Sequence, residues 1–241
     1  MSDIRLDILA FGAHPDDVEL GCAGTLLKLS QLGYSTGIID LTEGEKASRG
    51  TVEERYIESS ESAKLLGVKH RENLKISDAN ILLNEQNKVK VIETIRRLKP
   101  KIIFAPNAYD RHPDHIHAGE LVTEAAFYSG LAQISPTLPA HRPHKVIFYM
   151  TTYEFEPTFI VDITDQFKGK MKALKAYKSQ FYNPNWPGTQ TFVSSKWFME
   201  ALEFRARHFG WKSGVKYGEP FRMRELLALD DIMPVLTKNI M

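Results

Sequence analysis

The chain has 241 residues, of which 43% are hydrophobic and 25% are charged. These values are typical of a globular protein and exclude a wholly disordered chain. Lysine and arginine number 31 and aspartate and glutamate 30, for a net charge of +1, which argues against a dedicated binder of duplex DNA because such proteins need a basic face.

Short apolar runs alternate with segments of helical periodicity along the first two-thirds of the chain. Strands are predicted over 6–11, 35–41, 73–76, 101–105, 146–150 and 158–163, and helices over 20–32, 51–66, 84–98, 113–129 and 165–178. Thr51 and Glu54 have the spacing of a capping box, and Pro113 stands at the favoured first position of its helix. This alternation predicts an α/β fold with a mostly parallel sheet covered by helices on both faces.

The C-terminal third is less regular. Residues 182–191 are rich in proline, asparagine and glycine and predict a loop, whereas 195–209 predict a helix rich in aromatic residues. Residues 216–221 precede an acidic and apolar tail. With no repeat and no clear linker, we predict one domain over 1–241, with an α/β core (1–165) and a helical and irregular C-terminal extension (166–241).

The sequence also bears on the compartment. It contains no run of about 18 apolar residues, and its first residues lack the regions of a signal peptide. A single cysteine, Cys22, excludes an internal disulfide. We therefore expect a cytoplasmic protein with neither a membrane nor a nucleic acid as partner.

Two clusters of histidine, proline and aspartate follow predicted strands. HPDD (14–17) comes directly after the first strand, and HPDH (112–115) follows the strand at 101–105. In open α/β sheets, ligands bind outside the carboxyl ends of the strands. We therefore expect the two clusters to lie side by side, although either one alone could be a solvated turn and helix cap.

Together the clusters offer the ligands of a zinc site. Catalytic zinc takes three protein ligands and keeps a position open for water. His14, Asp17 and one histidine of the second cluster would supply that set. Asp16 cannot easily share the metal with its neighbour Asp17, so one of the two would be free to act as base. The base would act on a metal-bound water, whose pKa zinc lowers to about 7. The second histidine could stabilise an oxyanion, held by Asp114. Iron or cobalt would also suit these ligands.

The pair GAHPDDVELGCAG and RHPDHIHAG resembles the signature of the PIG-L/LmbE-like zinc N-deacetylases. That family removes acetyl groups from N-acetylglucosaminyl compounds. The resemblance implies a Rossmann-like fold and one Zn²⁺ per subunit. It further implies zinc ligands at His14, Asp17 and His115, a general base at Asp16, and an oxyanion stabiliser or general acid at His112, supported by Asp114.

A closer resemblance is to the bacillithiol-biosynthesis branch, carried by TEGEKASRGTVEERYIESSESAKLLGV, RENLKISD and KYGEPF. It implies a small-molecule substrate, N-acetylglucosaminyl-L-malate. The resemblance to the family as a whole implies a homo-oligomer, a trimer or a hexamer. Ala47 and Ser48 depart from the Gly-Thr step common in that branch, and alanine stiffens the loop. A neighbouring branch acts on diacetylchitobiose or N-acetylglucosamine, which is the alternative substrate.

Three arginines, Arg49, Arg55 and Arg111, are candidate substrate-binding residues. Malate carries two carboxylates, which arginine recognises with paired hydrogen bonds. The alternative is that they are surface arginines or helix ion pairs, such as Arg55 with Glu58.

Two other classes of protein remain open. A non-catalytic nucleotide-binding module would explain the strand and helix pattern, but the first strand is followed by HPDD rather than G-x-G-x-x-G. A metal-binding protein without catalytic activity would explain the two clusters.

Overall fold

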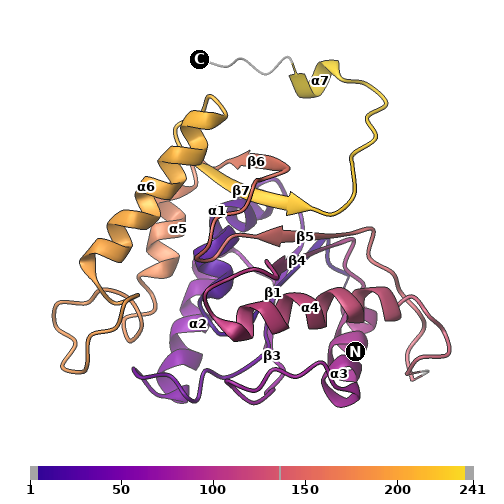
Figure 1. Cartoon of the computed structure of the whole chain (residues 1–241), viewed down its shortest axis with the longest axis horizontal. Coiled ribbons are helices and arrows are strands. Elements are labelled where there is room, and N and C mark those ends of the chain that lie inside the picture. Colours follow the sequence, from indigo (N-terminus) through magenta and orange to yellow (C-terminus); the bar gives the residue numbers. More distant parts are fainter. Residues whose placement is uncertain (1–4, 136, 237–241) are drawn as a thin grey trace.

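The computed structural model describes residues 5–135 and 137–236. The strands are β1 (Ile8–Gly12), β2 (Thr36–Asp40), β3 (His70–Asn73), β4 (Ile102–Pro106), β5 (Lys145–Tyr149), β6 (Phe159–Asp162) and β7 (Gly218–Met223). The helices are α1 (Asp17–Gln31), α2 (Val52–Leu66), α3 (Glu85–Leu98), α4 (Pro113–Tyr128), α5 (Phe167–Leu174), α6 (Lys196–Lys212) and α7 (Met233–Leu236). Figure 1 shows their arrangement.

These strands form one sheet in the order β3-β2-β1-β4-β5-β7-β6. Strands β1 to β5 pair in parallel, and β7 is antiparallel to both β5 and β6. The chain runs outward from β1 through β2 to β3 and then crosses back to β4 on the other side of β1. That reversal opens a crevice beyond the carboxyl ends of β1 and β4, where open α/β sheets bind ligands.

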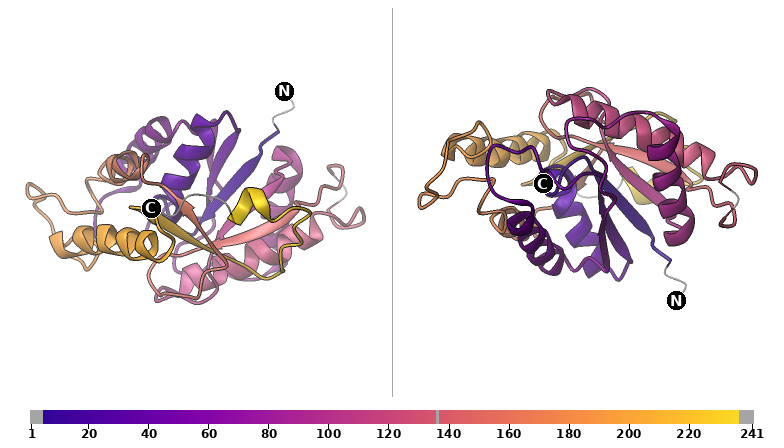
Figure 2. Two further views of the ribbon diagram at one scale, coloured as in Figure 1. Left: turned by 90° about the horizontal axis from the view of Figure 1, so that it is seen from above. Right: turned by 90° about the horizontal axis from the view of Figure 1, so that it is seen from below.

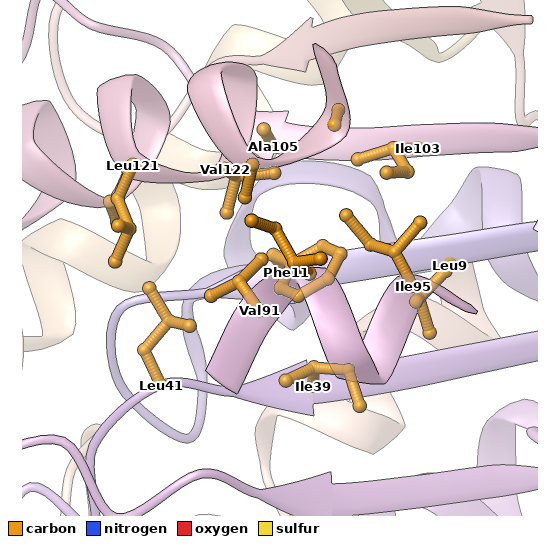
Figure 3. Packing of buried hydrophobic residues seen from close by; sticks show 14 of the residues in the cluster. Leu9, Phe11, Ile39, Leu41, Val91, Ile95, Ile103, Ala105, Leu121 and Val122 are labelled. Atoms are coloured by element: carbon orange, nitrogen blue, oxygen red, sulfur yellow. The ribbon is translucent and has the colours of Figure 1, made fainter. Parts of the chain in front are cut away.

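Helices cover both faces of the sheet, as Figure 2 shows from above and below. Alternate side chains of β1 face opposite layers: Leu9 and Phe11 pack with α3 and α4, whereas Ile8 and Ala10 pack with the layer that contains α1. Figure 3 shows the first of these cores, in which β1, β2 and β4 meet α3 and α4. The predicted mostly parallel α/β fold is confirmed.

Two strands differ from the prediction. Strand β3 lies at His70–Asn73 rather than at 73–76, because its sequence HREN is polar and half-buried at the sheet edge and has no apolar pattern. Strand β7 was not predicted, since Pro220 argues against a strand. It belongs to the C-terminal extension, yet it lies within the sheet between β5 and β6.

A buried carboxylate of β7 joins this strand to the first helix. Helix α1 is broken at Cys22, whose φ of −142° and ψ of 19° are not helical. Beyond the break, the backbone N–H groups of Gly24 and Thr25 donate to the Glu219 carboxylate over 2.9 and 2.7 Å. Lys170 Nζ, 2.6 Å from Glu219 Oε1, supplies the opposite charge. Glu219 thus caps the second half of α1.

Replacement of Glu219 by alanine should destabilise the protein strongly. It would leave the Lys170 charge and the two N–H groups buried without their partner, and breaking such a pair costs about 3–5 kcal/mol. We expect that loss in the free energy of unfolding measured with urea. Glu225→Ala, which removes an exposed carboxylate, is the matched control and should change it by less than about 0.5 kcal/mol. Equal, small effects of both variants would contradict the capping role.

Within the described residues, the structure has no helix both long and apolar enough to cross a membrane.

Candidate active site

The two HPD clusters meet at the crevice beyond neighbouring strands. The first forms the turn between β1 and α1, and the second precedes α4, whose N-cap is His112. Gly119 lets α4 approach the end of β4, since a Cβ there would lie 2.5 Å from the Pro106 carbonyl oxygen. The structure therefore brings together residues that lie about a hundred positions apart in the sequence.

His14, Asp17 and His115 form a compact group of possible metal ligands. Each offers one ligand atom, and these atoms lie within 4.8 Å of one another. His115 Nε2 is 3.0 Å from Asp17 Oδ1, and His14 Nδ1 is 3.4 Å from Asp17 Oδ2. His14, His112 and Asp114 form a second such group, which shares His14 with the first. Imidazole and carboxylate groups buried in this way suit zinc.

Two further aspartates, for which no role was predicted from the sequence, contact the ring nitrogens of the two proposed histidine ligands. Asp110 Oδ1 lies 2.9 Å from His115 Nδ1, which leaves Nε2 to face Asp17. Asp78 Oδ1 lies 3.0 Å from His14 Nε2. Both aspartates lie in loops near the carboxyl edge of the sheet, and that position was the signal available. Carboxylates behind ligating histidines fix the ring orientation in metal sites, which favours the first group.

The charges of the group favour a cation. Burial alone would lower the pKa of His115, but Asp17 and Asp110 raise it to about 9. Burial opposes the charge of His14 in the same way, yet Asp114, Asp17 and Asp78 raise its pKa well above the usual range. The residues present thus fit a divalent metal ion, since carboxylates surround both imidazoles.

Replacement of Asp110 by asparagine should weaken metal binding while the protein stays folded. The asparagine amide can still accept the Thr152 N–H, which lies 2.8 Å from Asp110 Oδ2. It lacks the negative charge that raises the pKa of His115. We expect the dissociation constant for zinc to rise about 10–100-fold, measured by competition with a chelator. Asp165→Asn, at an exposed position, is the control. Unchanged zinc affinity in Asp110→Asn would contradict the orienting role.

Asp16 lies beside the group but outside it, and its backbone is strained. Its φ of 131° and ψ of −21° are rare for a residue with a side chain, and such strain is common at functional sites. Its side chain lines the cavity of the site. Burial raises the pKa of the Asp16 carboxyl to about 7, against the opposing charge of Arg55. A carboxylate with that pKa can accept a proton near neutral pH and release it again.

His112 is held by a different group from the one expected. Its Nδ1 accepts the backbone N–H of Asp114 at 3.2 Å, which leaves Nε2 to carry the proton of the neutral ring. Burial and the nearby His14 and His115 lower the pKa of His112, which favours that neutral ring. The Asp114 carboxylate instead accepts the Ala79 N–H at 2.7 Å and lies 3.5 Å from His14 Nε2. Asp114 therefore holds His112 through its backbone and not through its carboxylate.

The three candidate arginines all line the cavity, whose volume is about 330 Å³. Arg55 is buried and donates to the Gln180 side chain and to the Pro15 carbonyl oxygen at 3.4 Å. Arg111 is exposed, and its guanidinium carbon lies 4.8 Å from the centre of the Phe192 ring. Arg49 is buried beneath the loop that contains Trp186.

The model of the PIG-L family, described as GlcNAc-PI de-N-acetylase, matches residues 9–126. Diacetylchitobiose deacetylase of Thermococcus kodakarensis is 29% identical over 89% of this chain and 82% of its own length. A probable N-acetyl-alpha-D-glucosaminyl L-malate deacetylase of Bacillus anthracis is 25% identical over 72% of this chain and 81% of its own.

Two solved structures are similar along almost the whole chain. A conserved protein of Thermus thermophilus has a TM-score of 0.85 and 36% identity, covering 94% of this chain and 98% of that one. The N,N'-diacetylchitobiose deacetylase of Pyrococcus horikoshii has a TM-score of 0.79 and 31% identity, and the match covers 90% of this chain and 82% of that one. With both HPD clusters assembled at one site, the chain belongs to the PIG-L family of deacetylases.

Proposed function

We propose that the protein is a zinc-dependent N-deacetylase of N-acetylglucosaminyl compounds. The observation that carries this proposal is the group His14, Asp17 and His115, with the carboxylate of Asp16 beside it in the same cavity. A zinc ion held by those three side chains would polarise the acetyl carbonyl and make a water molecule more acidic.

The chain's own residues would then move the protons. Asp16 accepts the proton of the attacking water, and Nε2–H of His112 donates to the oxyanion that develops on the acetyl group. Asp16, which holds the proton taken from the water, returns it to the departing amine, whereas neutral His112 keeps its Nε2 proton. Asp78 and Asp110 keep the two ligating imidazoles in place throughout.

For the substrate we propose N-acetylglucosaminyl-L-malate, which would give the protein a role in bacillithiol synthesis. The cavity supports this choice because four cationic side chains line it, and a dicarboxylate needs such partners: Lys46, Arg49, Arg55 and Arg111. Diacetylchitobiose is the second candidate, since two diacetylchitobiose deacetylases are 29% and 31% identical to this chain.

One measurement distinguishes between the two candidate substrates. Release of free amine is followed for N-acetylglucosaminyl-L-malate, diacetylchitobiose and N-acetylglucosamine, and kcat/KM is compared. We expect the malate conjugate to be preferred at least tenfold. A preference for diacetylchitobiose would make it the substrate in place of the malate conjugate and would leave the proposed deacetylation unchanged. No amine from any of the three would contradict the proposed reaction on these compounds.

Replacement of Arg111 by alanine offers a further check of the substrate. We expect KM to rise more for the malate conjugate than for N-acetylglucosamine, because arginine pairs with carboxylates. Arg207→Ala, which removes an exposed arginine of α6, is the control. Equal rises for both substrates would contradict a role for Arg111 with malate.

A further inference from the structure

Arg49 is a buried cation that forms no salt bridge with any of the described residues. Its side chain is 4% exposed, although it lies in the loop between β2 and α2. Its Nε donates to the Ser179 carbonyl oxygen at 2.8 Å. Within the described residues, however, neither Nη1 nor Nη2 has a hydrogen-bond partner. Burial of a charged donor without an acceptor is costly, and none of the described residues supplies an acceptor for these two atoms, so we expect a ligand to supply it.

The surroundings hold this guanidinium in place. Its carbon lies 5.2 Å from the centre of the Trp186 ring, within the range of a cation–π contact. Gln180 donates to the Arg49 carbonyl oxygen at 2.7 Å and accepts from Arg55, so it joins the two arginines. An arginine fixed in this way loses little conformational entropy when a ligand binds.

The loop that contains Trp186 supplies a third unpaired atom. Thr191 lies five residues after Trp186, lines the cavity together with Arg49, and its buried Oγ1 has no hydrogen-bond partner in the described chain. Two Nη donors in one plane and a hydroxyl match the two oxygens of a carboxylate better than they match a single sugar hydroxyl.

We propose that Arg49 and Thr191, with Trp186 behind the guanidinium, form a subsite for a carboxylate on the aglycone of the substrate. This inference rests on the proposed function and deepens it. The loop over 182–194, which contributes Trp186 and Thr191, would then select substrates with an acidic aglycone together with Arg49. Arg49 then acts in binding, whereas Asp16 and His112 act on the acetyl group.

Two substrates that share the sugar test the subsite. One is N-acetylglucosaminyl-L-malate and the other is methyl N-acetylglucosaminide, which has no carboxylate. We expect Arg49→Gln to lower kcat/KM for the malate conjugate about 30-fold, mainly through KM, because a hydrogen-bonded charge pair is lost. We expect a change below about threefold for the methyl glycoside, and a smaller loss for Arg49→Lys, which keeps the charge. Arg207→Gln is the control.

Other outcomes would overturn the proposal. They are equal losses for both substrates, no loss for either, or a loss confined to the methyl glycoside. Should the wild-type protein release no amine at all, the proposed function fails, and calorimetry with L-malate on the zinc-loaded protein decides the subsite. Binding at least tenfold weaker in Arg49→Gln would support it. Equal affinity, or no binding to the wild type, would overturn it.

Discussion

Asp16→Asn should lower kcat for deacetylation by at least about 10²-fold while zinc stays bound. The amide cannot accept the proton of the attacking water, whereas the three proposed ligands, His14, Asp17 and His115, remain in place. Burial brings the pKa of the Asp16 carboxyl to about 7, which suits a general base near neutral pH. The measurement is steady-state turnover together with the zinc content of each preparation.

Asp165→Asn is the matched control, because it makes the same chemical change at an exposed position. It should leave turnover unchanged. If Asp16→Asn turns over at a near-normal rate with full zinc, Asp16 is not the base. If it loses zinc as well, the carboxylate of Asp16 belongs to the metal group, and the separation of roles between Asp16 and Asp17 is wrong.

Asp17→Ala should abolish both metal binding and activity. It removes one of the three proposed ligands, and a metal ion contributes several kcal/mol to stabilising the transition state, so we expect a loss on the order of 10³-fold or more. Zinc content should fall from one ion per chain to nearly none. Because the Asp17 carboxylate also accepts the backbone N–H of His14 at 2.8 Å, thermal unfolding must show that the variant is folded.

His117→Ala is the control for Asp17→Ala, since His117 lies on α4 outside both candidate metal groups. It should keep one zinc ion and full turnover. A folded Asp17→Ala protein that retains zinc and activity would exclude Asp17 as a ligand and leave His14, His112 and Asp114 as the metal group.

The parallel part of the fold could be predicted because local sequence and tertiary environment agree there. Strand β1 is apolar on both sides, as a central strand between two helical layers must be. The capping box at Thr51 is present as its spacing predicted. Strands β3 and β7 were misplaced or missed because one is polar at the sheet edge and the other contains Pro220.

The motifs predicted which residues lie at the site, but not which other groups hold those residues in place. Contacts of Asp78 with His14, and of the Asp114 carboxylate with Ala79, depend on a loop that crosses from the end of β3, and no local pattern encodes that crossing. The unpaired Arg49 and the cap at Glu219 likewise depend on contacts between distant segments. The expected oligomer and cytoplasmic location remain predictions.

The most direct test of the central claim is amine release by the purified chain with its zinc content determined. N-acetylglucosaminyl-L-malate, diacetylchitobiose and N-acetylglucosamine are supplied before chelation, after chelation and after zinc is restored. We expect one zinc ion per chain and release from at least one substrate that chelation stops and zinc restores. Release that chelation leaves unchanged, or a chain that holds one zinc ion and deacetylates none of the three, would contradict it.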